Sequence, residues 1–335
     1  MKKLLLVALI VILTLVMVFA IGCKDKEVIP EGEYSIVSPD GAPAFALAIF
    51  AKDSMVSETL KVNPRIVSST LIRAEAIKSD FAIVPANMAS IIFNANEGYC
   101  MAASVTNGNM FIVSNRQNAE FTLNDLKGHV LYSIGQGSVP AFIMLKTLTN
   151  AGIEIVENSE TPVEGKVAIQ YCADGQALLA KLKTATDTLY GNLAEPAVTT
   201  MVAKNIGFRV ADLQTLWQAS TSSNIKGFAQ AVLIVKKEIC QNHPEVVNAV
   251  IDAMKNSEDY IVEHAQEARD NIAKIYPETS LPATMVAGIV RNCNVHVYRA
   301  SENYEYINAT LQAAYSIAPK TVGGSVPAKD SGFYY

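Results

Sequence analysis

The chain has 335 residues, of which 50% are hydrophobic and 18% are charged, and its formal net charge is -5 at pH 7. This composition is typical of a globular protein of one large domain or two lobes. Nucleic-acid binding requires a concentrated basic face, so the acidic balance, with a pI near 5.5, argues against DNA or RNA as a partner.

The N-terminal segment has the three zones of an export signal. Lys2 and Lys3 precede an uncharged apolar run, residues 4–21, which ends at Gly22. Such segments do not join the fold, so residues 1–22 are predicted to be a signal peptide. About 17–25 apolar residues can also span a bilayer, which leaves an uncleaved N-terminal anchor as the alternative.

The junction at Cys23 favours cleavage. Ala20-Ile21-Gly22-Cys23 resembles the lipobox of bacterial lipoproteins, in which a small residue precedes a cysteine that is acylated and becomes the new N-terminus. Ala20 departs from the Leu that is usual there. We expect a lipid anchor on Cys23 that holds the chain to the outer face of the cytoplasmic membrane, or to the periplasmic side if there is an outer membrane. Residues 23–33 are then the lipidated cysteine and a tether.

Four cysteines remain beside Cys23. Cys100, Cys172, Cys240 and Cys293 lie far apart and form no CxxC pattern, which argues against a metal cluster or a redox motif. Each lies in or beside an apolar stretch, so packing as a small buried hydrophobic side chain is favoured over disulfides. An oxidising compartment would permit pairing, and the sequence leaves this open.

Predicted strands and helices alternate from Tyr34 onwards. The first series has strands at residues 34–37, 65–68, 80–84 and 99–105, and helices at 44–52, 70–78 and 86–94. A strand at 110–114 and a turn at 123–128 follow. The second series has strands at 130–134, 167–172, 188–190 and 208–210, and helices at 139–151, 176–184 and 196–204. A strand at 229–235, a long helix opening at 243–245 and two or three further helices up to residue 316 complete the pattern.

This alternation predicts an α/β fold of two lobes, each a mostly parallel sheet flanked by helices. Ligands of such sheets bind outside the carboxyl ends of the strands. Two matched loops of small residues occupy such positions, at residues 38–43 and 133–140, and would face each other across a cleft. Both leave backbone N–H groups uncovered before a helix, an arrangement that attracts anionic or electron-rich groups. An ordinary strand-to-helix turn is the alternative for either loop.

Polar side chains follow other predicted strands. Asn87 comes after the third strand and Asn107 after the fourth, where an amide can bind a neutral polar ligand or form a plain turn. Glu195, in Ala194-Glu195-Pro196, is either a charge at a helix N-terminus or a ligand contact.

No catalytic set emerges from the sequence. The four histidines, at positions 129, 243, 264 and 296, lie outside the candidate loops, and there is no GxSxG, HExxH or P-loop pattern. Gly135-x-Gly137 lacks the third glycine of a dinucleotide fingerprint. Ser223 and Lys226 match SxxK, but no KTG triad accompanies them.

The order of these motifs resembles a known family. The chain carries in succession Ser-Pro-Asp-Gly-Ala-Pro-Ala from 38, Asp-Phe-Ala-Ile-Val-Pro-Ala-Asn from 80, Leu-Lys-Gly from 126, Gly-x-Gly-Ser from 135, Ala-Glu-Pro from 194, Lys-Lys-Glu from 236 and His-Pro-Glu from 243. This order is similar to the solute-binding lipoproteins of ABC importers, in the group of receptors for nitrate, sulfonates, taurine and the thiamine pyrimidine precursor.

The resemblance implies a two-lobed periplasmic-binding-protein fold with two crossing segments, near residues 109–115 and 227–236. Lobe I would comprise residues 34–112, lobe II residues 113–228, and residues 229–335 would form the return crossing and the C-terminal helices, mainly of lobe I. The lobes would close over a solute like a hinged clamp and deliver it to a permease driven by an ATPase. It also implies a monomer that needs no cofactor or metal ion.

The family's ligand contacts lie on the strand-end loops. The matching positions in this chain are Gly41, Ala42, Asn87, Asn107, Gly137, Ser138 and Glu195. None of these loops contains the Arg or Lys that receptors for strong anions often use, so a small neutral or amine-bearing organic solute is favoured over nitrate or sulfate.

Two other functions are compatible with this fold. One is an enzyme, because a thiamine-precursor synthase shares the architecture, although that synthase would need a lysine and a histidine near the cleft. The other is a sensory protein that presents its closed lobes to a receptor.

Overall fold

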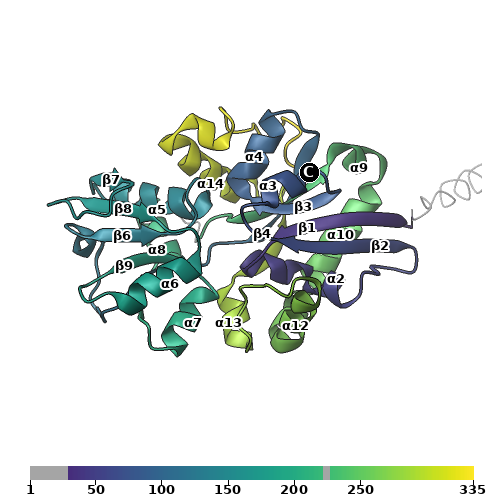
Figure 1. Cartoon of the computed structure of the whole chain (residues 1–335). Coiled ribbons are helices and arrows are strands. Elements are labelled where there is room, and N and C mark those ends of the chain that lie inside the picture. The colour runs from purple at the N-terminus through teal and green to yellow at the C-terminus, as the bar shows by residue number, and fades with distance from the viewer. Residues whose placement is uncertain (1–28, 222–226) are drawn as a thin grey trace, which may run out of the picture.

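The structure is a computed structural model that describes residues 29–221 and 227–335. It has two lobes, each built on one six-stranded sheet with helices packed around it (Figure 1). The predicted signal peptide, the lipid anchor at Cys23 and most of the tether lie outside the described residues. Within these ranges, no helix is both long and apolar enough to cross a membrane.

The first sheet has the strand order β12-β4-β11-β3-β1-β2. β1 pairs in parallel with β2 and β3, whereas β11 lies antiparallel between β3 and β4, and β12 is antiparallel to β4. The carboxyl ends of β1 to β4 therefore lie at one edge, where the chain leaves for the second lobe. The strands are β1 (Gly32–Pro39), β2 (Leu60–Val67), β3 (Phe81–Pro85), β4 (Tyr99–Thr106), β11 (Ala231–Lys236) and β12 (Val295–Arg299).

The second sheet has the order β10-β5-β9-β6-β8-β7. β6 pairs in parallel with β8 and β9, β7 pairs in parallel with β8, and β5 is antiparallel to β9 and β10. Most strands of each lobe thus share one direction. The sheets are mixed because β11 and β12 in the first sheet and β5 in the second run in the opposite direction. The strands are β5 (Met110–Ser114), β6 (Val130–Ser133), β7 (Ile155–Glu157), β8 (Val167–Tyr171), β9 (Tyr190–Ala194) and β10 (Phe208–Asp212).

Helices follow most strands of both lobes. Pro43 and Pro140 lie in the first turns of η1 and α5, where the fixed φ of proline suits a helix start. The first sheet carries the 3-10 helices η1 (Ala42–Leu47) and η3 (Pro319–Val322) and the α-helices α2 (Ala48–Lys52), α3 (Ile72–Ala76), α4 (Ala86–Asn94), α9 (Lys237–Asn242), α10 (Pro244–Asn256), α11 (Glu258–Glu263), α12 (Ala265–Ile275), α13 (Ala287–Asn292) and α14 (Tyr304–Ile317). The second carries η2 (Leu123–Leu126), α5 (Val139–Asn150), α6 (Gly175–Thr184), α7 (Ala197–Ala203) and α8 (Leu213–Thr221).

The two lobes repeat one arrangement. The strand order β11-β3-β1-β2 in the first lobe matches β5-β9-β6-β8 in the second, with the same relative directions. β1 is therefore the equivalent of β6, and β3 the equivalent of β9. The loops that follow these four strands lie on the facing edges of the two sheets.

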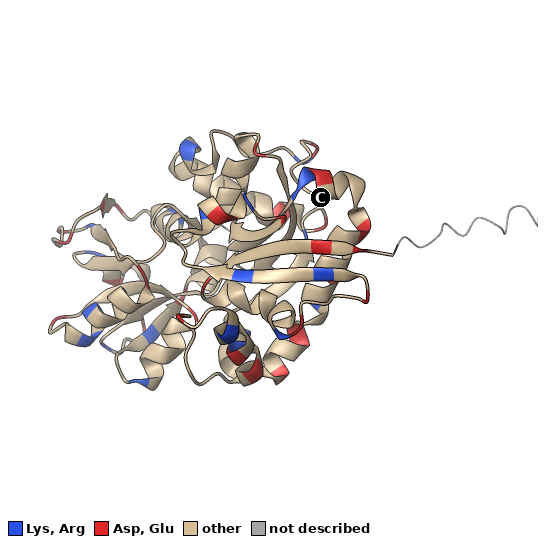
Figure 2. Cartoon of the chain, turned by 45° about the vertical axis from the view of Figure 1, so that its right-hand side comes forward, with Lys and Arg blue, Asp and Glu red and all other residues tan. Residues whose placement is uncertain are grey.

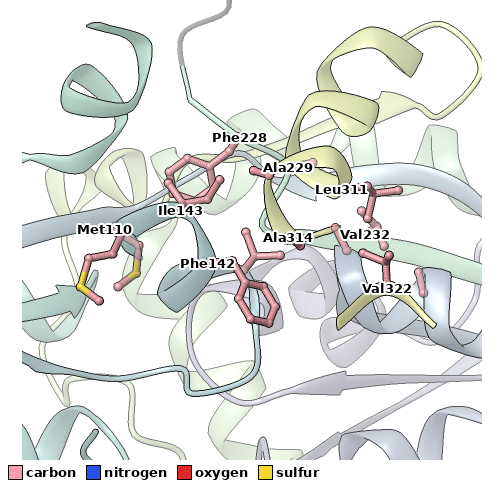
Figure 3. Close-up of a cluster of buried hydrophobic side chains, with 14 of the residues drawn as sticks. Met110, Phe142, Ile143, Phe228, Ala229, Val232, Leu311, Ala314 and Val322 are labelled. Atoms are coloured by element: carbon pink, nitrogen blue, oxygen red, sulfur yellow. The ribbon is translucent and has the colours of Figure 1, made fainter. Parts of the chain in front are cut away.

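The lobes also share a hydrophobic core. One buried cluster combines Met110 and Phe142 of the second lobe with Phe228 of the return crossing and Leu311 of α14 (Figure 3). Helix α14 packs against both α4 and α5 and so joins the lobes on one side of the crossings. A second cluster lies within the first lobe and a third within the second lobe.

Some elements differ from the sequence prediction. Residues 295–299 form an edge strand, β12, where only helices were expected, and the short strand β7 and the helix α8 were not predicted. Helix α9 was not predicted either, and four helices follow α10 where two or three were expected. The other predicted strands and helices overlap observed ones, with ends that differ by up to five residues, as at the start of β2. Acidic and basic residues are interspersed over both lobes in the view of Figure 2.

Candidate functional site

The loops after β1 and β6 have matching local structure. At the end of each strand a serine hydroxyl donates to the next carbonyl oxygen, from Ser38 to Pro39 at 3.0 Å and from Ser133 to Ile134 at 2.9 Å. Each loop then enters its helix through a glycine with positive φ, Gly41 at 99° and Gly137 at 74°. Most side chains are strained in this region of backbone space, so glycine is favoured at both positions.

The first loop is fixed to the C-terminal half of the chain. The Asp40 carboxylate accepts hydrogen bonds from the Thr279 hydroxyl at 2.6 Å and from the Ser280 amide at 2.7 Å. Ala42, the next predicted contact position after Gly41, is 3% exposed and packs into the core of the first lobe. In the second loop, the Ser138 hydroxyl donates to the Gly135 carbonyl oxygen at 2.9 Å, which closes the turn before α5.

Asn87 links the two lobes. It lies in the first turn of α4, and its Nδ2 donates to the Gly137 carbonyl oxygen of the second lobe at 3.2 Å and to the Thr321 carbonyl oxygen at 3.1 Å. Carbonyl oxygens only accept hydrogen bonds, so these partners establish which end of the amide is nitrogen. The Oδ1 of Asn87 is buried and has no hydrogen-bond partner among the described residues.

Asn107 is held where the chain leaves β4. Its Nδ2 donates to the His296 carbonyl oxygen at 2.8 Å, and its own carbonyl oxygen accepts from Asn294 Nδ2 at 2.8 Å and from the Tyr306 hydroxyl at 3.1 Å. Within residues 29–221 and 227–335, the buried Oδ1 of Asn107 likewise has no hydrogen-bond partner. The start of the first crossing is thus anchored to β12 and α14.

The two crossing segments are tied to each other. Gln230 of the return crossing donates from Nε2 to Asn109 Oδ1 at 2.9 Å and accepts from the Asn109 amide at 3.3 Å. The Asn109 carbonyl oxygen in turn accepts from the Glu195 amide at 2.9 Å, and this connects the hinge to the end of β9.

Asn192 repeats the pattern of Asn87 and Asn107 in the second lobe. It is 0% exposed in β9, and its Nδ2 donates to Ser133 Oγ at 3.0 Å and to the Pro140 carbonyl oxygen at 3.5 Å. Its Oδ1 has no partner in the part of the chain that the structure describes. Buried polar atoms without a partner are rare in folded proteins. The three carboxamide oxygens of this kind lie just after β3 (Asn87), just after β4 (Asn107) and within β9 (Asn192).

Glu195 has a structural role within the second lobe. Its carboxylate forms an ion pair with Arg209 and accepts from the Thr199 amide at 2.9 Å and the Thr199 hydroxyl at 3.1 Å. Burial raises the pKa of this carboxyl, and the bonds from Thr199 and the charge of Arg209 act in the opposite direction. Both carboxylate oxygens accept hydrogen bonds within the second lobe, so the side chain holds the first turn of α7 and Arg209 together.

A polar pocket of about 490 Å³ lies at the crossings. Asn107, Gly108 and Gly227 line it from the crossing segments, Asp212 and Gln214 from the second lobe, and Arg291 from α13. Because both lobes contribute walls, its shape depends on the angle between them. A second hollow of about 500 Å³, which includes Gln117, Phe208 and Arg209, belongs to the second lobe alone.

The four histidine side chains lie beside glutamates or pack against an aromatic ring. His296 Nδ1 lies 2.9 Å from Glu258, and this hydrogen bond raises the pKa of His296. His243 and His264 lie beside Glu245 and Glu267, and the His129 ring packs edge-on against Tyr190. Across residues 29–221 and 227–335, no three His, Cys, Asp or Glu side chains are grouped as they would be to bind a metal ion.

The predicted site residues therefore fall into four groups. Asn87 and Gly137 are in direct contact between the lobes, Asn107 lines the pocket at the crossings, and Gly41, Ala42 and Ser138 belong to the matched loops. Glu195 is paired with Arg209 inside the second lobe. Sequence reasoning missed Asn192, Asn109 and Gln230. Asn192 stands two residues before the Ala194-Glu195-Pro196 motif, whereas the Asn109–Gln230 pair is 121 residues apart in sequence and left no local signal.

Known structures share this fold. An ABC transporter structure from Parabacteroides distasonis matches with a TM-score of 0.70 and 19% identity, over 90% of this chain and 98% of that chain. The periplasmic aliphatic sulphonate binding protein SsuA from Escherichia coli matches with a TM-score of 0.64 and 15% identity, over 88% and 91%. The alkanesulfonate-binding protein SsuA from Xanthomonas axonopodis pv. citri, bound to MOPS, gives 0.61 and 12%, over 89% and 96%.

At these identities the likeness concerns the fold, which is the two-lobed periplasmic-binding-protein fold. No curated protein matches the chain in sequence. A family model does match, over residues 67–276, which is more than half of the chain. The chain belongs to the NMT1-like family.

Proposed function

We propose that this protein is the extracytoplasmic solute-binding component of an ABC import system, which captures a small organic solute between its lobes. The observation that carries the proposal is the set of three buried, unpaired oxygens on Asn87, Asn107 and Asn192. They are contributed by both lobes and by the crossing between them. A solute that reached more than one of these oxygens would be contacted from different parts of the chain at once, and such contacts favour the closed form.

The chemistry of these oxygens indicates the class of solute. Each amide nitrogen is already bonded to a carbonyl oxygen, so only the acceptor end is free. An acceptor is satisfied by an N–H or O–H donor. We therefore expect a solute with amine, amide or hydroxyl groups, such as a vitamin precursor or an amine-bearing sulfonate, and not nitrate or sulfate.

The proposed cellular setting follows from the N-terminal segment. A lipid on Cys23 and a tether up to residue 33 would keep the folded lobes at the membrane surface, within reach of a permease and its ATPase. The fold shared with alkanesulfonate-binding and aliphatic sulphonate binding proteins supports such a role. We propose that the chain works as a monomer without a cofactor.

An enzyme of the same fold is the second candidate. It would need a reactive lysine and a histidine beside the solute. Asn107 contacts the backbone carbonyl oxygen of His296, but the imidazole ring of His296 is hydrogen-bonded to Glu258. The His129 ring packs against Tyr190, and His243 and His264 lie beside glutamates. These arrangements favour binding without turnover. A sensory receptor would use the same binding site, and neighbouring permease or kinase genes distinguish import from sensing.

Mass spectrometry of solute retained through purification tests the proposal, together with thermal shift against vitamins, pyrimidines, amino acids and sulfonates. A ligand that binds only the native state at a hundredfold excess over its Kd stabilises it by about 2.7 kcal/mol, so one class should raise Tm clearly. No stabilisation across the panel, combined with turnover of any compound in it, would contradict the proposal.

A further inference from the structure

Two thiols of the first lobe are in very close contact. The Sγ atoms of Cys100 and Cys240 lie 2.7 Å apart, although the residues are 140 positions apart in sequence. Cys100 is the second residue of β4, opposite Val235 of β11, and Cys240 is in α9, which directly follows β11. A disulfide bond is about 2.05 Å long, so a small movement of either side chain would bring the sulfurs to bonding distance.

Neither core packing nor a metal site accounts for this contact as well as a disulfide does. Packing as ordinary buried hydrophobic groups does not require two sulfur atoms to approach so closely. A metal site would need further ligands, and none of the described residues supplies a group of three. Cys172 and Cys293 serve as a comparison, because both are buried and neither has a second thiol as a hydrogen-bond partner within the described part of the chain.

We propose that Cys100 and Cys240 are oxidised to a disulfide when the chain reaches the extracytoplasmic side, an inference that rests on the export in the proposed function. The oxidant is a protein or small-molecule disulfide. The Cys240 thiolate attacks one of its sulfurs and releases one thiol, and the Cys100 thiolate then attacks Cys240 and releases the second. Both cysteines lose their protons, and the two electrons reduce the oxidant to two thiols.

The geometry favours Cys240 as the first attacking group. Cys240 is partly exposed, whereas Cys100 is 4% exposed. The hydrogen bond from Cys100, aided by the nearby charge of Lys237, lowers the pKa of Cys240, while the same contact and burial raise the pKa of Cys100. A thiolate is the reactive form of cysteine, so an external disulfide would meet the more reactive thiol first.

The position of the bond in the fold gives it a specific effect. β4 leads into the first crossing and β11 receives the second, and the chain between Cys100 and Cys240 contains every strand of the second lobe. The disulfide would join the start of β4 to α9, the helix that follows the end of β11, and both lie away from the hinge. The cross-link would close a covalent loop that contains the whole second lobe. Such a loop lowers the conformational entropy of the unfolded chain and leaves the crossing segments free to bend.

Peptide mapping of the exported full-length chain, alkylated under denaturing, non-reducing conditions, tests the inference. We expect a linked Cys100–Cys240 peptide, an intact mass lower by two hydrogen atoms, and a Tm that falls by several degrees on reduction. Cys240→Ser should abolish the response of Tm to reductant, and the matched variant Cys172→Ser should keep it.

Two results would overturn the inference. One is alkylation of both cysteines in the exported chain, even if oxidised glutathione can link them in the purified protein. The other is a linkage that involves Cys172 or Cys293 instead. Solute binding is measured separately, so a chain that carries the disulfide and binds no solute contradicts the proposed import function and not the disulfide.

Discussion

Asn87 of the first lobe donates a hydrogen bond across the lobe junction to the carbonyl oxygen of Gly137, at 3.2 Å. A hydrogen bond of this kind contributes about 1 kcal/mol, which corresponds to a roughly fivefold change in the ratio of closed to open forms. Asn87→Ala should therefore increase the radius of gyration measured by small-angle X-ray scattering, because the open form becomes more populated.

Asn94→Ala is the matched control for this variant. Asn94 lies on the same helix, and its Nδ2 also donates to two carbonyl oxygens, of Val322 and Ser325, but both belong to the segment that follows α14. It should destabilise the fold without changing the radius of gyration. Equal scattering from the two variants would show that the Asn87 bond does not control closure.

Asn192→Leu tests the acceptor that the second lobe contributes. The substitution keeps the approximate volume and removes the oxygen, so affinity for the panel compound that raises Tm should fall tenfold or more, or by about 1.4 kcal/mol. Isothermal titration calorimetry measures this change. Asn115→Leu is the control, because Asn115 binds Ala185, Asp187 and Leu189 at the opposite end of β9. A similar loss in both variants would indicate general damage to the lobe.

Gly227→Ala tests how tightly the crossings are packed. Gly227 has a φ of 86°, and a Cβ there would lie 2.7 Å from the Asn107 carbonyl oxygen. Gly165→Ala has the same backbone cost, because its φ is 71°, but its Cβ would meet no atom within 4 Å. In urea titrations we expect Gly165→Ala to lower the free energy of unfolding by about 1 kcal/mol, and Gly227→Ala to lower it by about 1–3 kcal/mol more. Equal costs would mean that the crossings can rearrange freely.

Asp80 gives the fold a defined pH dependence. Burial opposes its ionisation, but hydrogen bonds from Lys236 at 2.8 Å and from the Ser35 amide and hydroxyl at 2.9 and 2.8 Å outweigh burial and lower the pKa of Asp80. A carboxyl group with a lowered pKa stabilises the fold at pH values above its pKa in the unfolded chain, about 3.9. This stabilisation is lost as the pH falls through the pKa of the group in the folded protein.

Asp80→Asn should therefore lower the free energy of unfolding by on the order of 1 kcal/mol at pH 7 and by much less near pH 3. Urea titrations at the two pH values measure the difference. Asp53→Asn, at an exposed carboxylate that accepts only from the Met55 amide, is the control. A penalty for Asp80→Asn that is independent of pH would contradict the ionic role.

The alternation of strands and helices was sufficient to predict the two-lobed fold, because buried strands and amphipathic helices leave a periodic pattern. β12 escaped detection although Val295 and Val297 alternate with His296 and Tyr298, since the strand is short and lies at an edge among helices. The matched loops were recognised for a physical reason: small residues and a proline are needed where the chain turns from a strand into a helix.

The interactions inside the site were less predictable. The position of Glu195 after β9 could be read from the sequence, but its Arg209 partner lies on β10 and could not be placed without the fold. The same applies to Asn109 with Gln230 and to Cys100 with Cys240, whose partners are separated by more than a hundred residues. Local pattern indicates which residues reach a strand end, whereas pairing between them depends on the assembled sheets.

The most direct test of solute capture between the lobes is a crystal structure of the whole chain with the panel compound that raises Tm. We predict N–H or O–H groups of the solute within about 3.2 Å of Oδ1 of Asn87, Asn107 or Asn192, with the lobes closed over it. A solute bound in the hollow of the second lobe beside Arg209, with all three asparagine oxygens still unpaired, would contradict this prediction.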